Sequence, residues 1–241
     1  QLRKVFKPAE GCVYIDADYS QIELRVLAHI SSDKNMIMAF KNGEDIHART
    51  ASEVFNIPLD EVTKEQRSKA KAVNFGIVYG ITDYGLSRNI GISRSEAKEY
   101  IDEYLRKFSG VKKYMNDIVA FAHENGFVET MFKRKRYLSD INSKSFTTRN
   151  FAERTAMNTP IQGTAADIIK IAMVNVFEKL KENSLESKLI LQVHDELIID
   201  AKRDELDLVK KILKTEMENA VSLNVPLIAE IGIGNSWYEA K

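Results

Sequence analysis

Acidic side chains interrupt two apolar segments of the chain that are otherwise typical of buried strands. Asp16 and Asp18 stand two residues apart in the first segment, so an extended backbone directs both to one face. Asp195 and Glu196 lie side by side in the second segment. An ionised carboxylate in a dry interior is costly unless it is paired or binds a metal. If the two segments meet in one sheet, a cation would relieve the mutual repulsion of these acids.

The metal that such oxygen ligands favour is Mg²⁺ or Mn²⁺, because no cluster of Cys and His residues suggests zinc. Each acid taken alone has a plainer interpretation. Asp16 and Asp18 are then strand-end acids in water, and Asp195 and Glu196 form a tight turn. Taken together, the four acids favour the metal site.

A second pattern runs along residues 64–80, where two cations are followed by two aromatic rings. Arg67, Lys71, Phe75 and Tyr79 recur every four residues and would lie along one line on a helix. Cations at this spacing suit phosphates, and the rings offer a stacking surface for a base. A solvated basic turn that leads into a buried aromatic turn would give the same pattern, so spacing alone leaves both interpretations open.

The elements that must position these residues are predicted from periodicity and from punctuating residues. Capping-box spacing marks three helix starts, with the pairs Ser20–Glu23, Thr63–Gln66 and Ser93–Glu96. The other predicted elements are a strand at 11–18, a short β-excursion at 127–138, a long helix at about 161–182, a hairpin at 188–201, a helix at 204–223 and a last strand at 227–232. This order predicts an α+β fold in which a helical block is inserted between sheet elements.

The composition bounds the class of protein. The chain of 241 residues has 35 basic and 35 acidic residues, which argues against a protein that simply coats nucleic acid. Its one cysteine, Cys12, is expected to be a small buried hydrophobe. No apolar stretch is long enough to cross a bilayer and no signal peptide is present, so we expect a cytoplasmic protein. The first residue is Gln1, which suggests a fragment of a longer chain.

Several motifs together resemble one known family. Residues 18–25 (DYSQIELR), 67–80 and 193–196 (VHDE) resemble, in order, the three polymerase motifs of the DNA polymerase I family, also called family A. Residues 158–167 and 43–47 are similar to two further blocks of that family, as is the ending at 234–238. The resemblance covers essentially the whole chain and is of the bacterial type.

The resemblance implies a polymerase palm, made of an antiparallel sheet with helices, and an all-helical fingers insertion. The palm would comprise residues 1–32 and 154–241, and the fingers residues 33–153. Family members also have thumb and exonuclease domains and an upstream palm segment, which this chain would lack. We therefore expect the chain by itself to have weak or no activity.

The activity implied by the resemblance is template-directed DNA polymerisation. A primer 3′-hydroxyl attacks the α-phosphate of a deoxynucleoside triphosphate, and pyrophosphate leaves, in a two-metal site of the general polymerase kind. Asp18 and Asp195 match the metal-binding aspartates of the family, and the carbonyl of Tyr19 would be a further ligand. The cofactor would be two Mg²⁺ ions, for which Mn²⁺ could substitute. Glu196 would either bind metal or tune the field there. Lys71 is the candidate to protonate the departing pyrophosphate.

The resemblance also assigns residues to the nucleotide. Arg67, Lys71 and His47 match triphosphate contacts, although His47 alone would be interpreted as a helix-surface histidine. Phe75 and Tyr79 match the residues that flank the incoming base. Glu23 would act as a steric gate against a ribose 2′-hydroxyl, and Gln21, in the same motif, would also face the nucleotide.

Contacts to primer–template DNA are implied for a further set of residues. Arg154, Asn158 and Gln162 recur every four residues on one helix face and match minor-groove contacts, where hydrogen bonding is nearly blind to sequence. His194 would approach the primer end. The basic run 133–136 is expected to be a solvated edge, with contact to the template backbone as the alternative. We expect the partners to be DNA and deoxynucleoside triphosphates, and the protein to be a monomer without membrane contact.

Two other functions fit parts of the pattern. A two-metal nuclease or phosphohydrolase would use the acids equally well, but it would leave the stripe from Arg67 to Tyr79 without a purpose. A non-catalytic fragment that binds nucleic acid is the second alternative. Release of pyrophosphate only in the presence of primer–template would separate the polymerase from both.

Overall fold

The computed structural model describes residues 2–241, and these divide into two compact units. We call the first the sheet unit; it holds the residues up to Ile22 and those from Ala165 onwards. The second, the helical unit, is Glu23–Thr164. The combination of an antiparallel sheet and many helices confirms the predicted α+β class. The narrower division into palm and fingers, with its boundaries at residues 32/33 and 153/154, stays a prediction.

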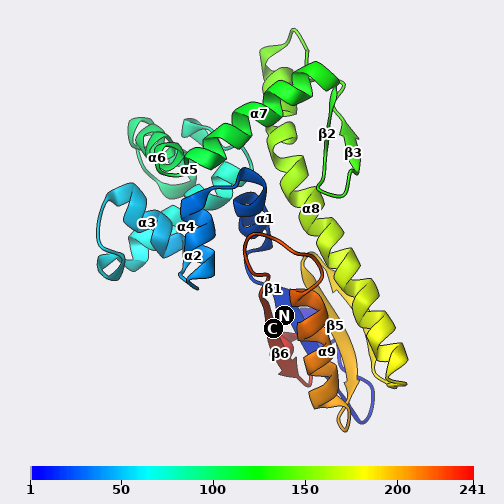
Figure 1. Ribbon diagram of the computed structural model, residues 1–241. Helices are drawn as coiled ribbons and strands as arrows, with labels where there is room; N and C mark the ends of the chain where they lie inside the picture. Colours follow the sequence, from blue (N-terminus) through cyan, green and yellow to red (C-terminus); the bar gives the residue numbers. More distant parts are fainter. Residues whose placement is uncertain (1) are drawn as a thin grey trace. The chain divides into compact units, whose positions relative to one another are not determined.

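The sheet unit is built on four antiparallel strands in the order β4-β5-β1-β6 (Figure 1). The chain therefore places its first strand, β1, between two strands from the last fifth of the sequence. The predicted N-terminal strand, the hairpin and the final strand all form, the last beginning two residues later than expected. Their bounds are β1 Cys12–Tyr19, β4 Lys188–Val193, β5 Glu196–Lys202 and β6 Ala229–Gly234.

Helix α9 (Leu206–Glu218) packs on this sheet and contacts β1, β5 and β6. Its buried face includes Val209, Leu213 and Met217, at the spacing of one side of a helix. It is shorter than the predicted helix at 204–223. The 3₁₀ turn η1 (Leu2–Lys4) and helix α10 (Trp237–Ala240) contact each other, and α10 also lies on β6.

Strand β4 corrects one prediction from the sequence. Its apolar run was expected to be buried, but Ile190 is 47% exposed and Leu191 is 39% exposed. The reason is its position: β4 lies at one edge of the sheet and has a paired neighbour only in β5 among the strands that the structure describes. The other predicted core positions hold, since Ile15, Ile199 and Cys12 are buried.

The helical unit contains α1 and a series of short helices (Figure 1). Two predicted capping boxes are present: the Thr63 and Ser93 side chains accept hydrogen bonds from the amides of Gln66 and Glu96, whose side chains bond back. The bounds are α1 Ile22–Ser31, α2 Lys34–Lys41, α3 Ile46–Phe55, η2 Leu59–Glu61, α4 Lys64–Val78, α5 Asp83–Ile90, α6 Arg94–Lys107 and α7 Ser109–Asn125. The predicted β-excursion is a two-stranded hairpin of β2 Phe127–Glu129 and β3 Lys135–Tyr137.

The third predicted capping box is wrong. Helix α1 begins at Ile22, so Ser20 lies two residues before it and Glu23 is its second residue. Between strand and helix, Gln21 adopts a left-handed backbone with φ of 56°. The chain thus turns more sharply than a capping box would require, and the Ser20 amide donates to the Ile228 carbonyl instead.

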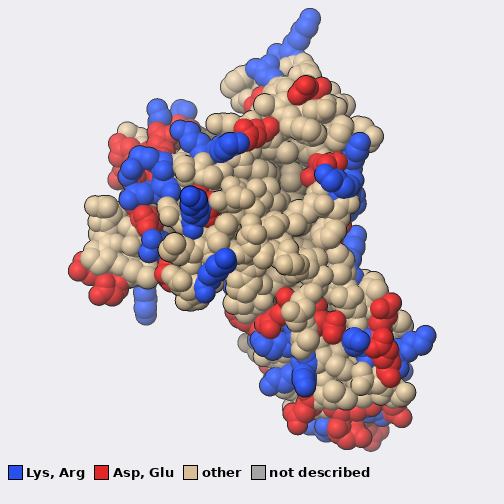
Figure 2. Space-filling view, in the orientation of Figure 1, with Lys and Arg blue, Asp and Glu red and all other residues tan. Residues whose placement is uncertain are grey.

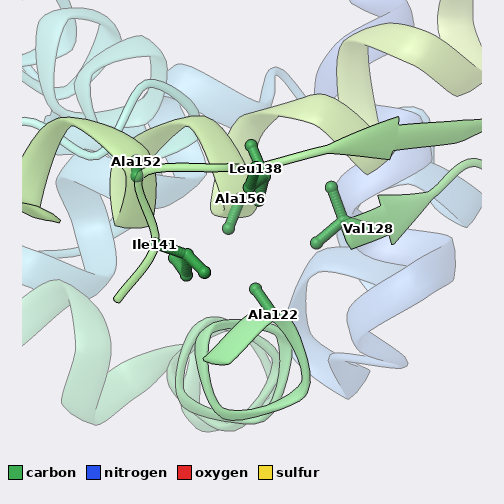
Figure 3. Close-up of a cluster of buried hydrophobic side chains, with 6 residues drawn as sticks. All are labelled: Ala122, Val128, Leu138, Ile141, Ala152 and Ala156. Carbon is green, nitrogen blue, oxygen red and sulfur yellow. The ribbon is translucent and has the colours of Figure 1, made fainter. Parts of the chain in front are cut away.

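The long helix α8 (Phe146–Glu182) starts fifteen residues, about four turns, earlier than the predicted start at residue 161. The predicted start directly follows Pro160, but Pro160 lies inside the helix. A proline there removes one backbone hydrogen bond and is normally unfavourable. Packing offsets that cost, because Ala152 and Ala156, on the first half of α8, are buried in a cluster with side chains of α7, β2 and the segment after β3 (Figure 3).

Basic and acidic side chains are interspersed on the face drawn in Figure 2, so neither sign covers it alone. This agrees with the balanced composition. Within residues 2–241, no helix combines the length and the apolar character needed to cross a bilayer.

Candidate functional site

The fold brings the two acidic segments of the sequence together in the sheet unit. Strands β1 and β5 pair so that Asp18 lies opposite Glu196. The Tyr19 amide donates to the Asp195 carbonyl at 3.1 Å, which fixes Asp195 beside the end of β1. His194, at the turn of the hairpin, has φ of 54°, so the backbone reverses just before the acids. The predicted meeting of two acid-bearing strand ends is therefore confirmed.

The acids in this cluster disfavour one another's charge. Burial, and then the neighbouring Asp18 carboxylate, raise the pKa of Asp195 to about 6. Burial, and then Glu196, raise the pKa of Asp16 to about 7. Asp16 is only 3% exposed, and in the described chain both of its carboxylate oxygens are buried without a hydrogen-bond partner. The cluster therefore stores unfavourable electrostatic energy that a cation would relieve.

Glu196 is occupied differently from the two aspartates. It is 2% exposed, and its Oε1 accepts a hydrogen bond from Trp237 Nε1 at 3.2 Å. Its Oε2 is paired with Lys241 Nζ, which also lies 3.4 Å from Asp18 Oδ2. Arg3 Nη2 approaches Oε1 at 3.9 Å. Because both oxygens of Glu196 have cationic or N–H partners, the residue is held in place by the unit itself.

The donor set fits a hard divalent cation that keeps part of its hydration. Asp18 Oδ1 is buried without a hydrogen-bond partner in the chain that the structure describes, and Asp195 is the adjacent carboxylate. The same residues, 2–241, contain no group of three or more His, Cys, Asp or Glu arranged as a complete metal cage. Mg²⁺ characteristically binds one or two carboxylates and completes its shell with water and substrate phosphate. Two aspartates therefore suffice for Mg²⁺, whereas a structural zinc site would need more ligands.

In the helical unit, the predicted stripe lies on α4 as expected. Arg67, Lys71 and Tyr79 are exposed and Phe75 is half-buried. The opposite face is buried through Ala70, Val73 and Ile77, which seals α4 to its neighbours. An open pocket of about 990 Å³ runs along the stripe and is lined, among others, by Lys71, Phe75, Tyr79 and Arg154. Cations and rings therefore share one concave surface.

Arg67 is engaged with an acid that the sequence analysis did not single out. Its Nε and Nη2 donate to Asp45 Oδ2 at 2.9 and 2.6 Å. The other oxygen of Asp45 caps α3 by accepting from the amides of His47 and Ala48. Despite partial burial, these hydrogen bonds and the Arg67 charge lower the pKa of Asp45. Arg67 still has N–H groups left for an anion, because a guanidinium has five.

His47 taken alone was interpreted as a helix-surface histidine, and this interpretation is wrong because the side chain is buried. It is 3% exposed, and its Nδ1 lies 3.0 Å from Asn74 Nδ2. Its ring centroid lies 5.8 Å from that of Phe75. Burial lowers its pKa to about 4, with Arg67 and Lys71 acting in the same direction and Asp45 against it. His47 is therefore neutral at pH 7 and could contact a phosphate only as a neutral hydrogen-bond donor.

Glu23 and Tyr79 meet within the helical unit: the Tyr79 hydroxyl donates to Glu23 Oε2 at 3.2 Å. The hydrogen bond ties the start of α1 to the end of α4, and it limits the freedom of the Glu23 side chain. Gln21 is half-buried in the turn before α1.

The residues predicted to contact DNA lie on more than one element. Arg154 and Asn158 are half-buried on α8 and Gln162 is exposed, four residues apart as predicted. Arg154 packs against Gly80, where an added Cβ would lie 2.9 Å from Arg154 Cγ. His194 is exposed at the hairpin turn. In the basic run, Arg134 donates to the Gly163 carbonyl at 3.0 Å and Arg136 to Thr159 Oγ1 at 3.3 Å, so part of it is tied to α8.

The model of the family described as DNA polymerase family A matches residues 1–239. This chain belongs to DNA polymerase family A. It is 61% identical over 240 residues to DNA polymerase I of Caldicellulosiruptor bescii, a match that covers 100% of this chain and 28% of that protein. It is 55% identical over 242 residues to DNA polymerase I of Bacillus subtilis, again over 100% of this chain and 28% of the relative. The chain thus spans about 28% of the length of these curated relatives.

A solved structure of a polymerase domain has the same fold. It is described as the POL domain of Pol1 from M. smegmatis in complex with DNA primer-template and dNTP. The two chains are 44% identical, with a TM-score of 0.95, over 99% of this chain and 42% of that one. The likeness confirms the predicted mixed fold of a polymerase domain.

Four residues around these sites escaped the sequence analysis of this family A chain. Asp45 contacts Arg67 of the stripe, Asn74 contacts His47, and Trp237 and Lys241 hold Glu196. For Asp45 a signal existed, since it lies within the family-like block 43–47 and an acid before a helix is a common N-cap. The partners of Glu196 lie 41 and 45 residues further along the chain, and no local spacing reveals such a contact.

Proposed function

We propose that this chain carries the polymerase site of a template-directed DNA polymerase, which adds deoxynucleotides to a primer 3′-hydroxyl and releases pyrophosphate. The observation that carries the proposal is the meeting of Asp18 and Asp195 at the paired ends of β1 and β5, in a family A chain. Further support comes from the solved relative, which was captured with DNA primer-template and dNTP. In this proposal the palm comprises residues 1–32 and 154–241, and the fingers residues 33–153.

The acid cluster is the proposed place of two Mg²⁺ ions. Asp18 and Asp195 would hold them with their carboxylates and Tyr19 with its carbonyl, and Mn²⁺ could substitute. When bound, such ions lower the pKa of the attacking hydroxyl and neutralise charge on the leaving oxygens. Glu196 keeps its oxygens on Trp237 and Lys241, so we assign it to shaping the field of the site instead of direct ligation.

The chain's own residues would bind and orient the nucleotide. Arg67 and Lys71 would neutralise the triphosphate, since they are exposed cations one helical turn apart on α4, and Lys71 lines the pocket beside the two rings. Lys71 has the further role of donating a proton to the departing pyrophosphate. Phe75 and Tyr79 would stack near the base, and His47 would donate a hydrogen bond to a phosphate oxygen.

The remaining roles concern the sugar and the DNA. Glu23, held by the Tyr79 hydroxyl, would exclude a ribose 2′-hydroxyl, and Gln21 would line the same region. Contacts to primer–template are proposed for a separate set of residues, Arg154, Asn158, Gln162 and His194. Hydrogen bonds in the minor groove suit a copying enzyme because they depend little on sequence.

The test is primer extension with simultaneous measurement of pyrophosphate, in the complete natural protein. Asp18→Asn and Asp195→Asn should each reduce extension by about 1,000-fold or more, because each removes several kcal/mol of charge stabilisation. Asp207→Asn, an exposed acid on α9, is the matched control and should keep normal activity.

Binding of Mn²⁺, followed by electron paramagnetic resonance, provides a second readout. The wild-type protein with deoxynucleoside triphosphate should bind two ions at this site, and Asp18→Asn should lose at least one. Pyrophosphate release that needs no primer–template, or full extension by Asp18→Asn, would overturn the proposal in favour of a hydrolase or a non-catalytic fragment.

A further inference from the structure

Three polar side chains form a buried cluster between α3 and α4, behind the stripe. His47 and Thr50 come from α3 and Asn74 from α4. Their exposed fractions are 3%, 0% and 0%. Asn74 Nδ2 lies 3.0 Å from His47 Nδ1 and 3.0 Å from Thr50 Oγ1, and the Thr50 hydroxyl lies 3.1 Å from Asn74 Oδ1. Buried polar groups are retained at a cost, which these mutual hydrogen bonds offset.

The cluster determines which ring nitrogen of His47 carries the proton. A neutral imidazole has one N–H and one acceptor nitrogen, and the hydrogen bond at one nitrogen decides the other. The charged groups that face the ring are Asp45, Arg67 and Lys71, and with burial they leave it neutral at pH 7. Because the Asn74 amide donates to Nδ1, Nδ1 is the acceptor and the proton lies on Nε2.

The tautomer matters for an anionic ligand. Phosphate oxygens accept hydrogen bonds, so a ring with Nε2–H attracts them and a ring with a bare Nε2 lone pair repels them. We propose that Asn74 is a positioning residue of the triphosphate site: its side-chain amide holds His47 as the tautomer that donates from Nε2. This inference rests on the proposed function, since it assumes that a triphosphate lies on the Arg67 and Lys71 stripe.

Thr50 has a supporting role in the same device. An Asn side chain can turn over and present its oxygen to His47, which would favour a proton on Nδ1. The Thr50 hydroxyl lies 3.1 Å from Asn74 Oδ1 and 3.0 Å from Nδ2, so it holds the amide group in place beside α3, whereas the choice between the two orientations is left to the contact with His47. Removing that hydroxyl should loosen the orientation of Asn74 without removing the contact to His47.

The tautomer is tested directly by long-range ¹H–¹⁵N NMR of protein labelled with ¹⁵N in histidine. The His47 signals are identified by their loss in His47→Ala. We expect the pattern of a proton on Nε2 in the wild type, and a mixture of both tautomers in Asn74→Leu. A wild-type pattern with the proton on Nδ1 would overturn the inference, and this result needs only His47→Ala, for the assignment, and not Asn74→Leu to be folded.

A double-mutant cycle tests whether Asn74 acts through His47. The affinity for Mg²⁺–dTTP is measured by calorimetry in the complete natural protein. Asn74→Leu and His47→Ala should each weaken binding by about 10-fold, the value of one hydrogen bond to a charged group, and the double variant should be no weaker than His47→Ala alone. Thr50→Val should weaken binding less than Asn74→Leu does. Independent, multiplying effects would mean that Asn74 only supports the fold, and would overturn the inference.

Arg67→Ala and Lys71→Ala distinguish a failure of the inference about Asn74 from a failure of the proposed function. If both weaken dTTP binding while His47→Ala does not, the present inference fails and the proposed function stands. If neither weakens it, the triphosphate site itself is refuted and the proposed function fails with it.

Discussion

Asp16 and Asp18 are neighbours on one face of β1, yet they have different surroundings. The Asp16 carboxylate is 3% exposed and faces Glu196, whereas the Asp18 side chain is 41% exposed and reaches Lys241. The family motif begins at Asp18 and does not include Asp16, but the buried position of Asp16 affects its titration. A buried acid without a hydrogen-bond partner in the described chain should titrate far from its usual range.

Asp16 should therefore make stability fall as pH rises. Its pKa is about 7 in the folded protein against an ordinary value of 3.8, so between these values the folded state holds the additional proton. The favourable contribution is complete below about pH 4 and is lost as pH passes 7. In Asp16→Asn, urea unfolding between pH 4 and 7 should show a shallower decline, by up to about 1.4 kcal/mol per pH unit. An unchanged slope would show that Asp16 is solvated.

A second prediction at this scale concerns discrimination between sugars. Glu23→Ala removes the proposed gate and should raise ribonucleotide incorporation relative to deoxynucleotide by about 10-fold or more, which corresponds to roughly 1.4 kcal/mol. Tyr79→Phe removes only the hydroxyl that holds Glu23 and should give a smaller rise in the same direction. Competition between ribo- and deoxynucleotides in primer extension by the complete protein measures both. Equal sugar discrimination in wild type and Glu23→Ala would remove the assigned role.

At the scale of elements, one residue, Asp45, contacts both the start of α3 and the first residue of the stripe. Asp45 caps α3 with one oxygen and pairs with Arg67 through the other. Asparagine caps helices as well as aspartate does, but it carries no charge. Substitution can therefore separate the cap from the ion pair.

We expect Asp45→Asn to keep the stability of the protein and to tighten triphosphate binding by a few-fold, because an exposed ion pair is worth up to about 1 kcal/mol. Asp45→Ala should gain the same affinity but lose about 1 kcal/mol of unfolding free energy with the cap. Calorimetry with Mg²⁺–dTTP and urea unfolding measure the two effects. Weaker binding by Asp45→Asn would mean that Asp45 orients Arg67 for the phosphate and does not compete with it.

Helix α10 and strand β6 are joined so closely that side chains are excluded between them. A Cβ on Gly232 would lie 1.7 Å from the backbone oxygen of Ala240, and backbone cannot yield as a flexible side chain does. Gly232→Ala should therefore destabilise the sheet unit by about 3 kcal/mol. Glu230→Ala, an exposed position on the same strand, is the control and should change stability little. Thermal unfolding measures both.

The elements also show what local sequence can and cannot reveal. The hairpin was predictable, because alternation and turn residues act over a few positions. The meeting of Asp18 with Asp195 joins distant parts of the sequence, so it was expected only on the condition that both segments share one sheet and from the family resemblance. The start of α8 was not, since Pro160 is tolerated only through the packing of Ala152 and Ala156. The burial of His47 also escaped prediction, because its partner Asn74 lies on another helix. Such contacts depend on tertiary packing, which no spacing rule contains.

For the whole molecule, the decisive fact is that the chain spans about 28% of its curated relatives. The two units contain the residues proposed for chemistry and for the nucleotide, but the family's thumb was not expected in this stretch. Duplex DNA is held through many phosphate contacts, and each one lost weakens binding. The resemblance therefore predicts that the proposed site forms in this chain but that the chain binds duplex DNA weakly.

Primer extension by residues 1–241 alone should be at least about 10-fold slower than by the complete natural protein at equal concentration, and the difference should grow with salt. Triphosphate binding should change much less, because its proposed ligands lie in the helical unit. Extension assays at several salt concentrations, together with calorimetry, check this. Equal extension rates at every salt concentration would show that these residues grip DNA unaided.

The outer edge of β4 affects the tendency of the protein to aggregate in concentrated solution. Among the strands of residues 2–241 none pairs with its outer edge, Ile190 and Leu191 are exposed beside it, and an edge of that kind templates the addition of another strand. A purified sample of this stretch should become turbid or scatter light more strongly as it is concentrated. A lysine at position 190 should keep the solution clear.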